Sequence, residues 1–193
     1  QWYGSEREQT EAYRHIVRSL ISSLELKAFS DTDFPSFHEI NKFSKTGMDN
    51  ADQRYLTTMI HGNGSYRVWG NRGSTRRLNF TLYPDGSPLA SSFATLTSDD
   101  LIVDENGLFE LFIGGKKREP NWLPLKTERY RLLIRQIYSD WDNEKAGDIH
   151  IDRIDKDRPL YPSLSKEKMI ANLDDATHDF KTNVQLWPEL SRT

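Results

Sequence analysis

Three clusters of polar residues in this sequence could carry chemistry. The first contains Lys45, Asp49, Asn50 and Asp52, in a stretch broken by glycine. Two carboxylates three residues apart on a loop could bind a divalent cation or position a water molecule. A calcium-binding loop would need further oxygen ligands and a terminal glutamate, which this stretch lacks. The favoured interpretation is therefore structural, with turns and a helix N-cap formed by Asp49 or Asn50.

The second cluster consists of arginines around the glycine-bounded turn 70–73, namely Arg67, Arg72, Arg76 and Arg77. Guanidinium groups beside flexible backbone could hold a carboxylate or phosphate with paired hydrogen bonds. The turn lacks the lysine-bearing pattern of a phosphate-binding loop. A solvated hairpin tip explains Arg76 and Arg77, whereas Arg72 stays a candidate for binding an anion.

The third cluster centres on Arg135 and Gln136, which lie inside an otherwise apolar strand. An unpaired buried charge costs several kcal/mol. We therefore expect Arg135 to be buried and paired with Glu110 on an adjacent strand, with Gln136 in the same structural polar network. A functional version of this network would leave one carboxylate in a pocket, with a raised pKa, as a general acid or base.

Other reactive patterns are missing from the sequence. There is no cysteine, no histidine pair with zinc-helix spacing and no serine in a Gly-x-Ser-x-Gly turn. No metal site is predicted, and no pattern indicates a cofactor. The aromatic residues Trp69, Trp122 and Trp141 could line a groove for a carbohydrate or another ring, although packing at strand ends is their more common role.

Composition limits the partners of the chain. Its 193 residues carry a net charge of −3, from 26 basic and 29 acidic side chains, which gives no general footprint for nucleic acid or an anionic membrane. No apolar run approaches the roughly 20 residues that span a bilayer. The chain begins Gln1-Trp2-Tyr3, with neither an initiator methionine nor a signal peptide, so we expect a fragment of a longer protein.

Hydrophobic periodicity predicts the elements that must position these residues. Apolar residues recur every three or four positions near both ends of the chain, and alternate with period two in several segments between them. We predict an α+β fold, an antiparallel β-sandwich or jelly-roll core flanked by N- and C-terminal amphipathic helices. The expected parts are an N-terminal helix over 5–29, an irregular connection over 30–63 with a short helix around 52–59, the β-sandwich domain over 64–154, and a linker with the C-terminal helix over 155–193.

An ordered set of short motifs resembles bacterial proteins of the family called domain of unknown function 1214. The motifs cover most of residues 11–154 and lie at 11–14, 45–50, 66–73, 99–101, 107–110, 121–124, 134–136 and 140–144. This chain departs from the family pattern at Ala51, where a proline is usual, and at the turn 116–119. The resemblance implies longer bacterial proteins in which helices flank a β-rich domain.

The family supplies no established catalytic residue, so candidates come from positions where family pattern and local polarity coincide. The candidate binding residues are Lys45, Asp49, Asp52, Arg67, Arg72, Asn121 and Trp122. We expect the loop 45–52 and the turn 70–73 to meet at one end of the sandwich.

Three functions compete at this stage. The leading hypothesis is a recognition or assembly domain that binds a protein partner, or itself, through the amphipathic helices. The second is an enzyme that acts on a small organic or carbohydrate substrate, in which Arg135 or Arg72 holds an anion and Glu110, Asp49 or Asp52 transfers a proton. The third is a peripheral subunit of a larger membrane complex. A small anionic or carbohydrate molecule is the expected ligand class.

Overall fold

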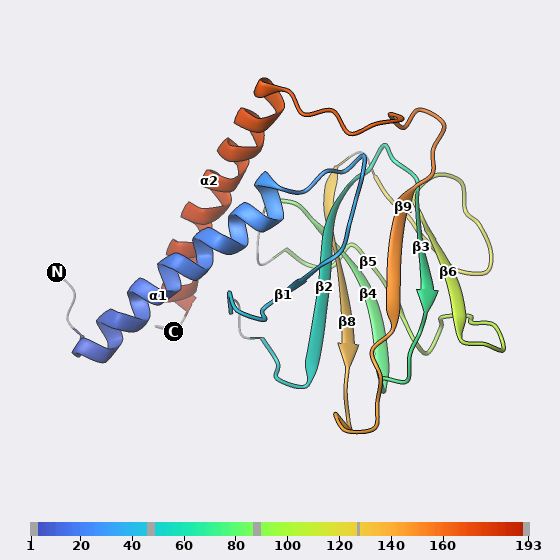
Figure 1. The fold of residues 1–193 in the computed structure, drawn as a ribbon, viewed down its shortest axis with the longest axis horizontal. Coiled ribbons are helices and arrows are strands. Elements are labelled where there is room, and N and C mark those ends of the chain that lie inside the picture. Colours follow the sequence, from blue (N-terminus) through green and yellow to red (C-terminus); the bar gives the residue numbers. More distant parts are fainter. Residues whose placement is uncertain (1–3, 46–48, 87–89, 127, 191–193) are drawn as a thin grey trace. The chain divides into compact units, whose positions relative to one another are not determined.

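The computed structural model describes residues 4–45, 49–86, 90–126 and 128–190, which form two compact units (Figure 1). The helical unit contains the described parts of 1–29, 40–49 and 164–193. The sandwich unit contains the described parts of 30–39 and 50–163. Helices at the two ends of the chain and a sandwich of two sheets confirm the predicted fold class.

The N-terminal helix begins where the sequence predicts. Helix α1 (Glu6–Ser23) starts with a capping box, in which the Ser5 hydroxyl accepts a hydrogen bond from the Glu8 amide at 3.3 Å and the Glu8 carboxylate accepts one from the Ser5 amide at 2.6 Å. The hydrogen bond from the Ser5 amide lowers the pKa of Glu8. A π-helical segment, η1 (Leu24–Ala28), continues α1.

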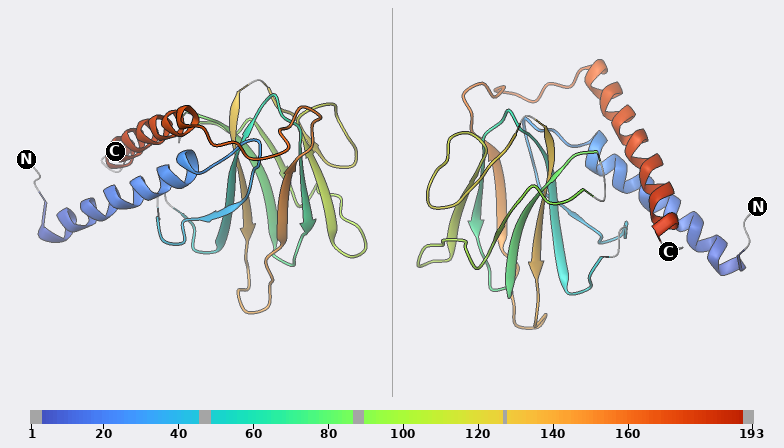
Figure 2. Two further views of the ribbon diagram at one scale, coloured as in Figure 1. Left: turned by 45° about the horizontal axis from the view of Figure 1, so that its top comes forward. Right: turned by 180° about the vertical axis from the view of Figure 1, so that it is seen from behind.

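Helix α2 (Lys166–Leu190) packs against α1 and η1 within the same unit, as Figure 2 shows from two sides. The Ser165 hydroxyl caps it by accepting a hydrogen bond from the Lys168 amide at 3.1 Å. Ser23 donates a hydrogen bond to the Asp179 carboxylate at 2.7 Å. The contact between the helices is thus partly polar.

Helix α1 leaves much of its hydrophobic side uncovered. Ser19 and Ser23 are fully buried, whereas Tyr13 and Val17 are 71% and 56% exposed. The exposed residues form an apolar stripe along one side of α1, made of Tyr13, Ile16, Val17, Leu20 and Ile21. Helix α2 therefore leaves this stripe of α1 open, because α1 turns its small serine side inward. The expectation that the amphipathic helices bind a partner or a second copy stays a prediction.

Two sheets form the sandwich unit (Figure 1). The five-stranded sheet has the order β1 (His38–Ile40), β2 (Gln53–His61), β8 (Arg129–Ile137), β4 (Arg77–Pro84) and β5 (Ala94–Thr97). The four-stranded sheet has the order β7 (Trp122–Leu123), β6 (Leu108–Ile113), β3 (Tyr66–Asn71) and β9 (Asp148–Arg153). In the first sheet, the neighbouring pairs β2–β8, β8–β4 and β4–β5 are antiparallel. In the second sheet, β6–β3 and β3–β9 are antiparallel, whereas β7 pairs with β6 in parallel.

A single apolar core lies between the two sheets. Alternate residues of each strand point inward, as the period-two pattern predicts, and Phe80 meets Phe109 edge to face with ring centroids 5.5 Å apart. Each fully buried side chain of this size contributes about 1.5–3 kcal/mol. The fully buried members of the core are Ile60, Tyr66, Val68, Leu78, Phe80, Leu82, Leu111, Ile113, Tyr130, Leu132 and Ile134.

The segment before residue 64 differs from its prediction. Residues 30–63 contain β1 and β2 rather than only an irregular connection, and the helix expected around 52–59 is strand β2. Thr57, Thr58, Met59 and Ile60 are all buried, so both faces of this strand are covered. A strand buried on both faces has no alternation of polar and apolar residues, which explains the error.

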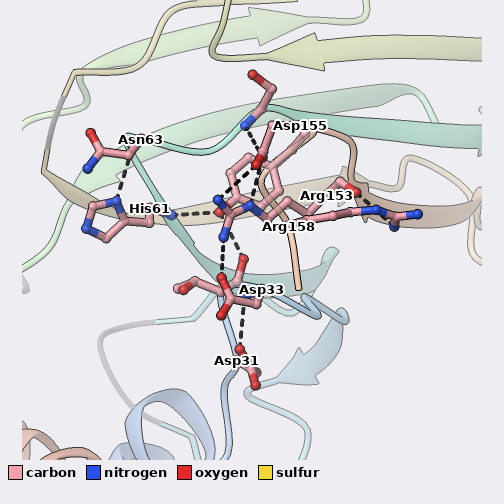
Figure 3. Close-up of polar contacts among 10 residues, drawn as sticks. Asp31, Asp33, His61, Asn63, Arg153, Asp155 and Arg158 are labelled. Atoms are coloured by element: carbon pink, nitrogen blue, oxygen red, sulfur yellow. Dashed lines mark hydrogen bonds and ion pairs between the residues drawn. The ribbon is translucent and has the colours of Figure 1, made fainter. Parts of the chain in front are cut away.

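A buried arginine fastens segment 30–33 to the end of β9 (Figure 3). Arg153 donates to both carboxylate oxygens of Asp155, at 2.7 and 3.0 Å, and to Asp33. The Tyr66 hydroxyl donates to the Thr32 carbonyl at 2.9 Å. Burial raises the pKa of Asp155, but the hydrogen bonds from Arg153 and the Ser65 amide outweigh this effect and leave the pKa lowered.

We expect Asp155→Asn to lower the free energy of unfolding by about 2 kcal/mol at pH 7, because it removes a charged hydrogen-bond partner from Arg153. A carboxylate with a lowered pKa stabilises the fold above its unfolded pKa of about 3.9, and loses that effect as pH falls through the folded pKa. Urea unfolding at pH 7 and pH 3 should therefore show a difference between wild type and variant that shrinks in acid. A difference of equal size at both pH values would contradict this account. The exposed Asp157→Asn is the control.

Candidate functional site

A groove of about 650 Å³ lies on the outward face of the four-stranded sheet, entirely within the sandwich unit. The pleat of antiparallel strands brings outward residues of neighbouring strands into rows. In the central row, Trp69 of β3 lies opposite His150 of β9 on one side and Glu110 of β6 on the other. The groove is lined by Arg67, Trp69, Gly70, Asn71, Ile102, Val103, Asp104, Leu108, Phe109, Glu110, Pro120, Asp148 and His150.

Three neighbours fix the orientation of the Trp69 ring. His150 stacks on it with a centroid separation of 4.6 Å and an interplanar angle of 30°. The indole N–H donates to the Asp152 carboxylate at 2.7 Å. The Arg67 guanidinium lies 5.3 Å from the ring centroid, within the range of a cation–π contact. The aromatic residue at the centre of the groove is therefore held in a defined position.

The electrostatics of the groove are dominated by carboxylates. Glu110 forms an ion pair with Arg67, and Asp148 lies 3.2 Å from Nε2 of His150. Asp104 accepts hydrogen bonds from the amides of its own turn, including that of Leu108 at 2.8 Å. With His150 neutral, one arginine and three carboxylates give the lining a formal charge of −2. The groove therefore has an acidic field around an aromatic centre.

Arg67 also offers a donor. Its Nε atom is buried and has no hydrogen-bond partner within the described parts of the chain. A buried donor without a partner is costly, and a ligand or solvent oxygen would satisfy it. Of the seven candidate binding residues, Arg67 lines the groove within the described part of the chain, and it does so beside Trp69, which the sequence offered as a ring-binding aromatic residue.

Asn121 builds one wall of the groove instead of facing a ligand. Its side chain is 1% exposed, and its amide accepts from the Ile102 amide at 2.9 Å. The same amide donates to the carbonyls of Ile102 at 2.8 Å and Glu110 at 2.9 Å. These bonds hold segment 101–103 beside β6, where Ile102 and Val103 form the apolar side of the groove. Asn121 is a positioning residue.

The remaining candidates of the sandwich unit are engaged with nearby backbone. Trp122 donates to the Gly114 carbonyl at 3.0 Å. Arg72 donates to the carbonyls of Gly73 and Arg76, at 3.3 and 3.5 Å. The Asp52 amide donates to the Asn50 side chain at 2.8 Å, which forms an Asx turn. The Asx turn at Asn50 is the turn chemistry that the sequence offered as the alternative to a site, whereas the helix N-cap expected at Asp49 or Asn50 is wrong, because strand β2 follows.

The expected meeting of loop 45–52 with turn 70–73 is seen only in part. The strand order places the start of β2, after Asp52, and the end of β3, before Arg72, at the same end of the sandwich. Lys45 and Asp49 form an ion pair at 3.0 Å in the helical unit, and Thr46 to Met48 fall outside the described residues. The contacts of Arg72 described above hold it to its own turn, not to Asp52.

The predicted pair of Arg135 with Glu110 is wrong, because β8 and β6 belong to different sheets. Arg135 donates to the Tyr83 hydroxyl at 3.1 Å, and Glu110 pairs with Arg67. Gln136, next along β8, points to the opposite face, where its side-chain oxygen accepts from the Gly147 amide at 2.5 Å. The three residues therefore contribute to three separate contacts.

The described residues show neither a metal cluster nor a spanning helix. Within them, no group of three histidine, cysteine or carboxylate side chains is placed to hold a metal ion. No helix in these ranges has the length and apolar character needed to cross a membrane.

Comparisons with known proteins show the fold alone. No protein-family model and no curated protein matches the chain, so the resemblance to domain of unknown function 1214 is not confirmed. The crystal structure of an uncharacterized protein from Burkholderia cenocepacia matches 98% of this chain with a TM-score of 0.91 and 24% identity. The matched part is 54% of that protein, so this chain spans about half its length. A Vibrio parahaemolyticus protein of 14% identity matches 56% of this chain and 32% of its own, with a TM-score of 0.45.

We expect Asn121→Leu to lower the free energy of unfolding by about 2–4 kcal/mol, because it leaves buried backbone groups of residues 102 and 110 without partners. The Ile102 amide should also exchange its hydrogen faster, since it loses its acceptor. Urea unfolding and amide hydrogen exchange test both effects, with the exposed Asn63→Ala as control. Unchanged protection of the Ile102 amide would contradict the positioning role.

Proposed function

We propose that this chain is a recognition module that binds a carbohydrate in the groove centred on Trp69. The observation that carries the proposal is the position of Trp69, a partly exposed aromatic ring on the floor of a 650 Å³ groove. Sugar rings present apolar C–H faces that pack on aromatic rings, and their hydroxyls need both donors and acceptors. The groove supplies both kinds of group.

The polar residues around Trp69 suit a hydroxylated ligand. Arg67 and Asn71 can donate hydrogen bonds, and Glu110, Asp148 and Asp104 can accept them. Planar side chains that bond through two atoms fix the orientation of a ligand more sharply than single hydroxyls do. Leu108 and Ile102, which are 49% and 56% exposed, offer apolar contact beside the ring.

The same geometry favours binding over catalysis. Asp49 is paired with Lys45, and Glu110 with Arg67, so two of the three carboxylates proposed for proton transfer are engaged in ion pairs. The Arg72 guanidinium is bonded to its own turn. We propose that the chain acts as an accessory domain of a larger bacterial protein, consistent with the family it resembles.

We expect Trp69→Ala to weaken carbohydrate binding about tenfold or more, since it removes the central packing surface of the groove. Calorimetric titration with neutral gluco- and manno-oligosaccharides measures this change. Trp141→Ala is the matched control, because Trp141 is 49% exposed and stacks on Tyr138 away from the groove lining. Circular dichroism checks that both variants fold. No heat of binding to wild type at millimolar sugar, or equal losses in both variants, would refute the proposal.

The helical unit supports a second role, association with a second copy of the chain. The apolar stripe of α1 leaves Tyr13, Val17 and Leu20 exposed, and each such residue would gain about 1.5–3 kcal/mol from full burial. A stripe that is apolar along its length is complementary to itself. Two copies can therefore cover it in a two-fold contact.

We expect Val17→Glu to prevent this association, because it places a charge within the apolar stripe. Light scattering over a range of concentrations should show the wild-type mass rising toward that of a dimer, while the variant stays monomeric. Arg7→Glu, an exposed change outside the stripe, should behave as wild type. A wild-type chain that is monomeric at every concentration would rule out self-association.

A further inference from the structure

The charge of the groove indicates which carbohydrate it prefers. We infer that its ligand is a saccharide with a free, protonated amino group; the inference rests on the carbohydrate site proposed above. Three carboxylates and one arginine line the groove, so its formal charge is −2 with His150 neutral. A field of that sign attracts an ammonium group and repels a uronate, a sialic acid or a phosphate.

The carboxylates are arranged so that their charge reaches the ligand. The Asp148 side chain is 83% exposed and lies 3.2 Å from Nε2 of His150. Glu110 is 47% exposed although it pairs with Arg67. Glu110 lies in the Trp69 row and Asp148 lies opposite Asn71, so an amino group on a sugar packed against the Trp69 ring would lie within reach of a carboxylate.

Arg67 does not cancel this preference. Its charge is neutralised by Glu110, and its guanidinium is held over the Trp69 ring at 5.3 Å from the centroid. Its side chain is 39% exposed, so the exposed guanidinium N–H groups can donate a hydrogen bond to a sugar oxygen. Arg118 packs over the Phe112 ring and is not part of the lining. The arginine thus contributes a donor, while the carboxylates set the sign of the field.

Of the ligand classes expected from the sequence, a small anion suits the groove less well than a carbohydrate. An anion would have to approach Asp104, Glu110 and Asp148 together, and the only arginine of the lining is already paired. A neutral sugar would use the aromatic and hydrogen-bonding groups but gain nothing from the charge. An amino sugar uses the aromatic ring, the hydrogen-bonding groups and the negative charge of the groove.

The experiment compares two ligands that differ at one substituent. Glucosamine oligosaccharides and their N-acetylated counterparts share the sugar ring and linkage, but the first carry a free amine where the second carry a neutral acetamide. A calorimetric titration of both at pH 7 compares these two groups, and the salt dependence identifies the part of the difference that is due to charge. We expect the free-amine form to bind about two- to fivefold more tightly, the range for an exposed ion pair. The difference should shrink as salt is raised from low to high concentration.

Variants locate the effect within the groove. Asp148→Asn should weaken the free-amine form more than the N-acetylated form, which brings the affinities of the two oligosaccharides closer together. Asp157→Asn is the matched control, since Asp157 is exposed and lies beyond the opposite end of β9. Trp69→Ala should weaken both ligands.

The outcomes separate this inference from the proposed carbohydrate site. Equal affinity for the two ligands, with both lost in Trp69→Ala, would overturn the preference for an amine and leave the site intact. An oligouronate that binds more tightly than the free-amine oligosaccharide would likewise overturn the preference for an amine. Binding of the amine form that survives Trp69→Ala would show non-specific attraction and overturn the inference. If neither oligosaccharide nor any neutral sugar binds, both proposals are wrong.

Discussion

The sandwich unit depends on the placement of one buried charge, that of Arg153 at the end of β9. Its guanidinium is 14% exposed at the side-chain level and holds both Asp155 and Asp33. Without these carboxylates the charge would be costly to bury, and without the arginine the carboxylates would repel each other. The result is a link between β9, at the edge of the four-stranded sheet, and segment 30–33, which leads into β1 of the other sheet (Figure 3). Polar side chains thus close one end of an apolar core.

The groove lies on the outward face of the four-stranded sheet, away from the core, and the packing of β3, β6 and β9 against the core determines which residues line it. Once Val68, Leu111 and Ile151 are buried between the sheets, the intervening residues of β3, β6 and β9 must point outward. Pairing without a register shift then aligns His150, Trp69 and Glu110 across three strands. A slip of one residue would turn these side chains into the core, so the register that satisfies the core also creates the site.

Local pattern in the sequence was enough to predict the helices, most of the strands and the sandwich, because each depends on the period of nearby residues. It failed for β2, whose buried pairs Thr57-Thr58 and Met59-Ile60 hide the alternation. It also failed for Arg135 and Glu110, since local pattern does not reveal which strands become neighbours. Trp69 was recognised as a ring-binding candidate, but its partners His150 and Glu110 are separated from it by about 80 and 40 positions. Only the sheet topology brings them together.

The contacts of Trp69 bear on how strongly the groove could bind. An indole fixed by His150, Asp152 and Arg67 has little rotational freedom left to lose when a ligand arrives. The wall at Ile102 is likewise held in place by the Asn121 side chain, which accepts from the Ile102 amide and donates to the carbonyls of Ile102 and Glu110. Because folding has already ordered these groups, ligand binding does not have to pay the entropy cost of ordering them, and the affinity is higher. The buried amide of Asn121 therefore influences recognition through the rigidity of the wall it supports.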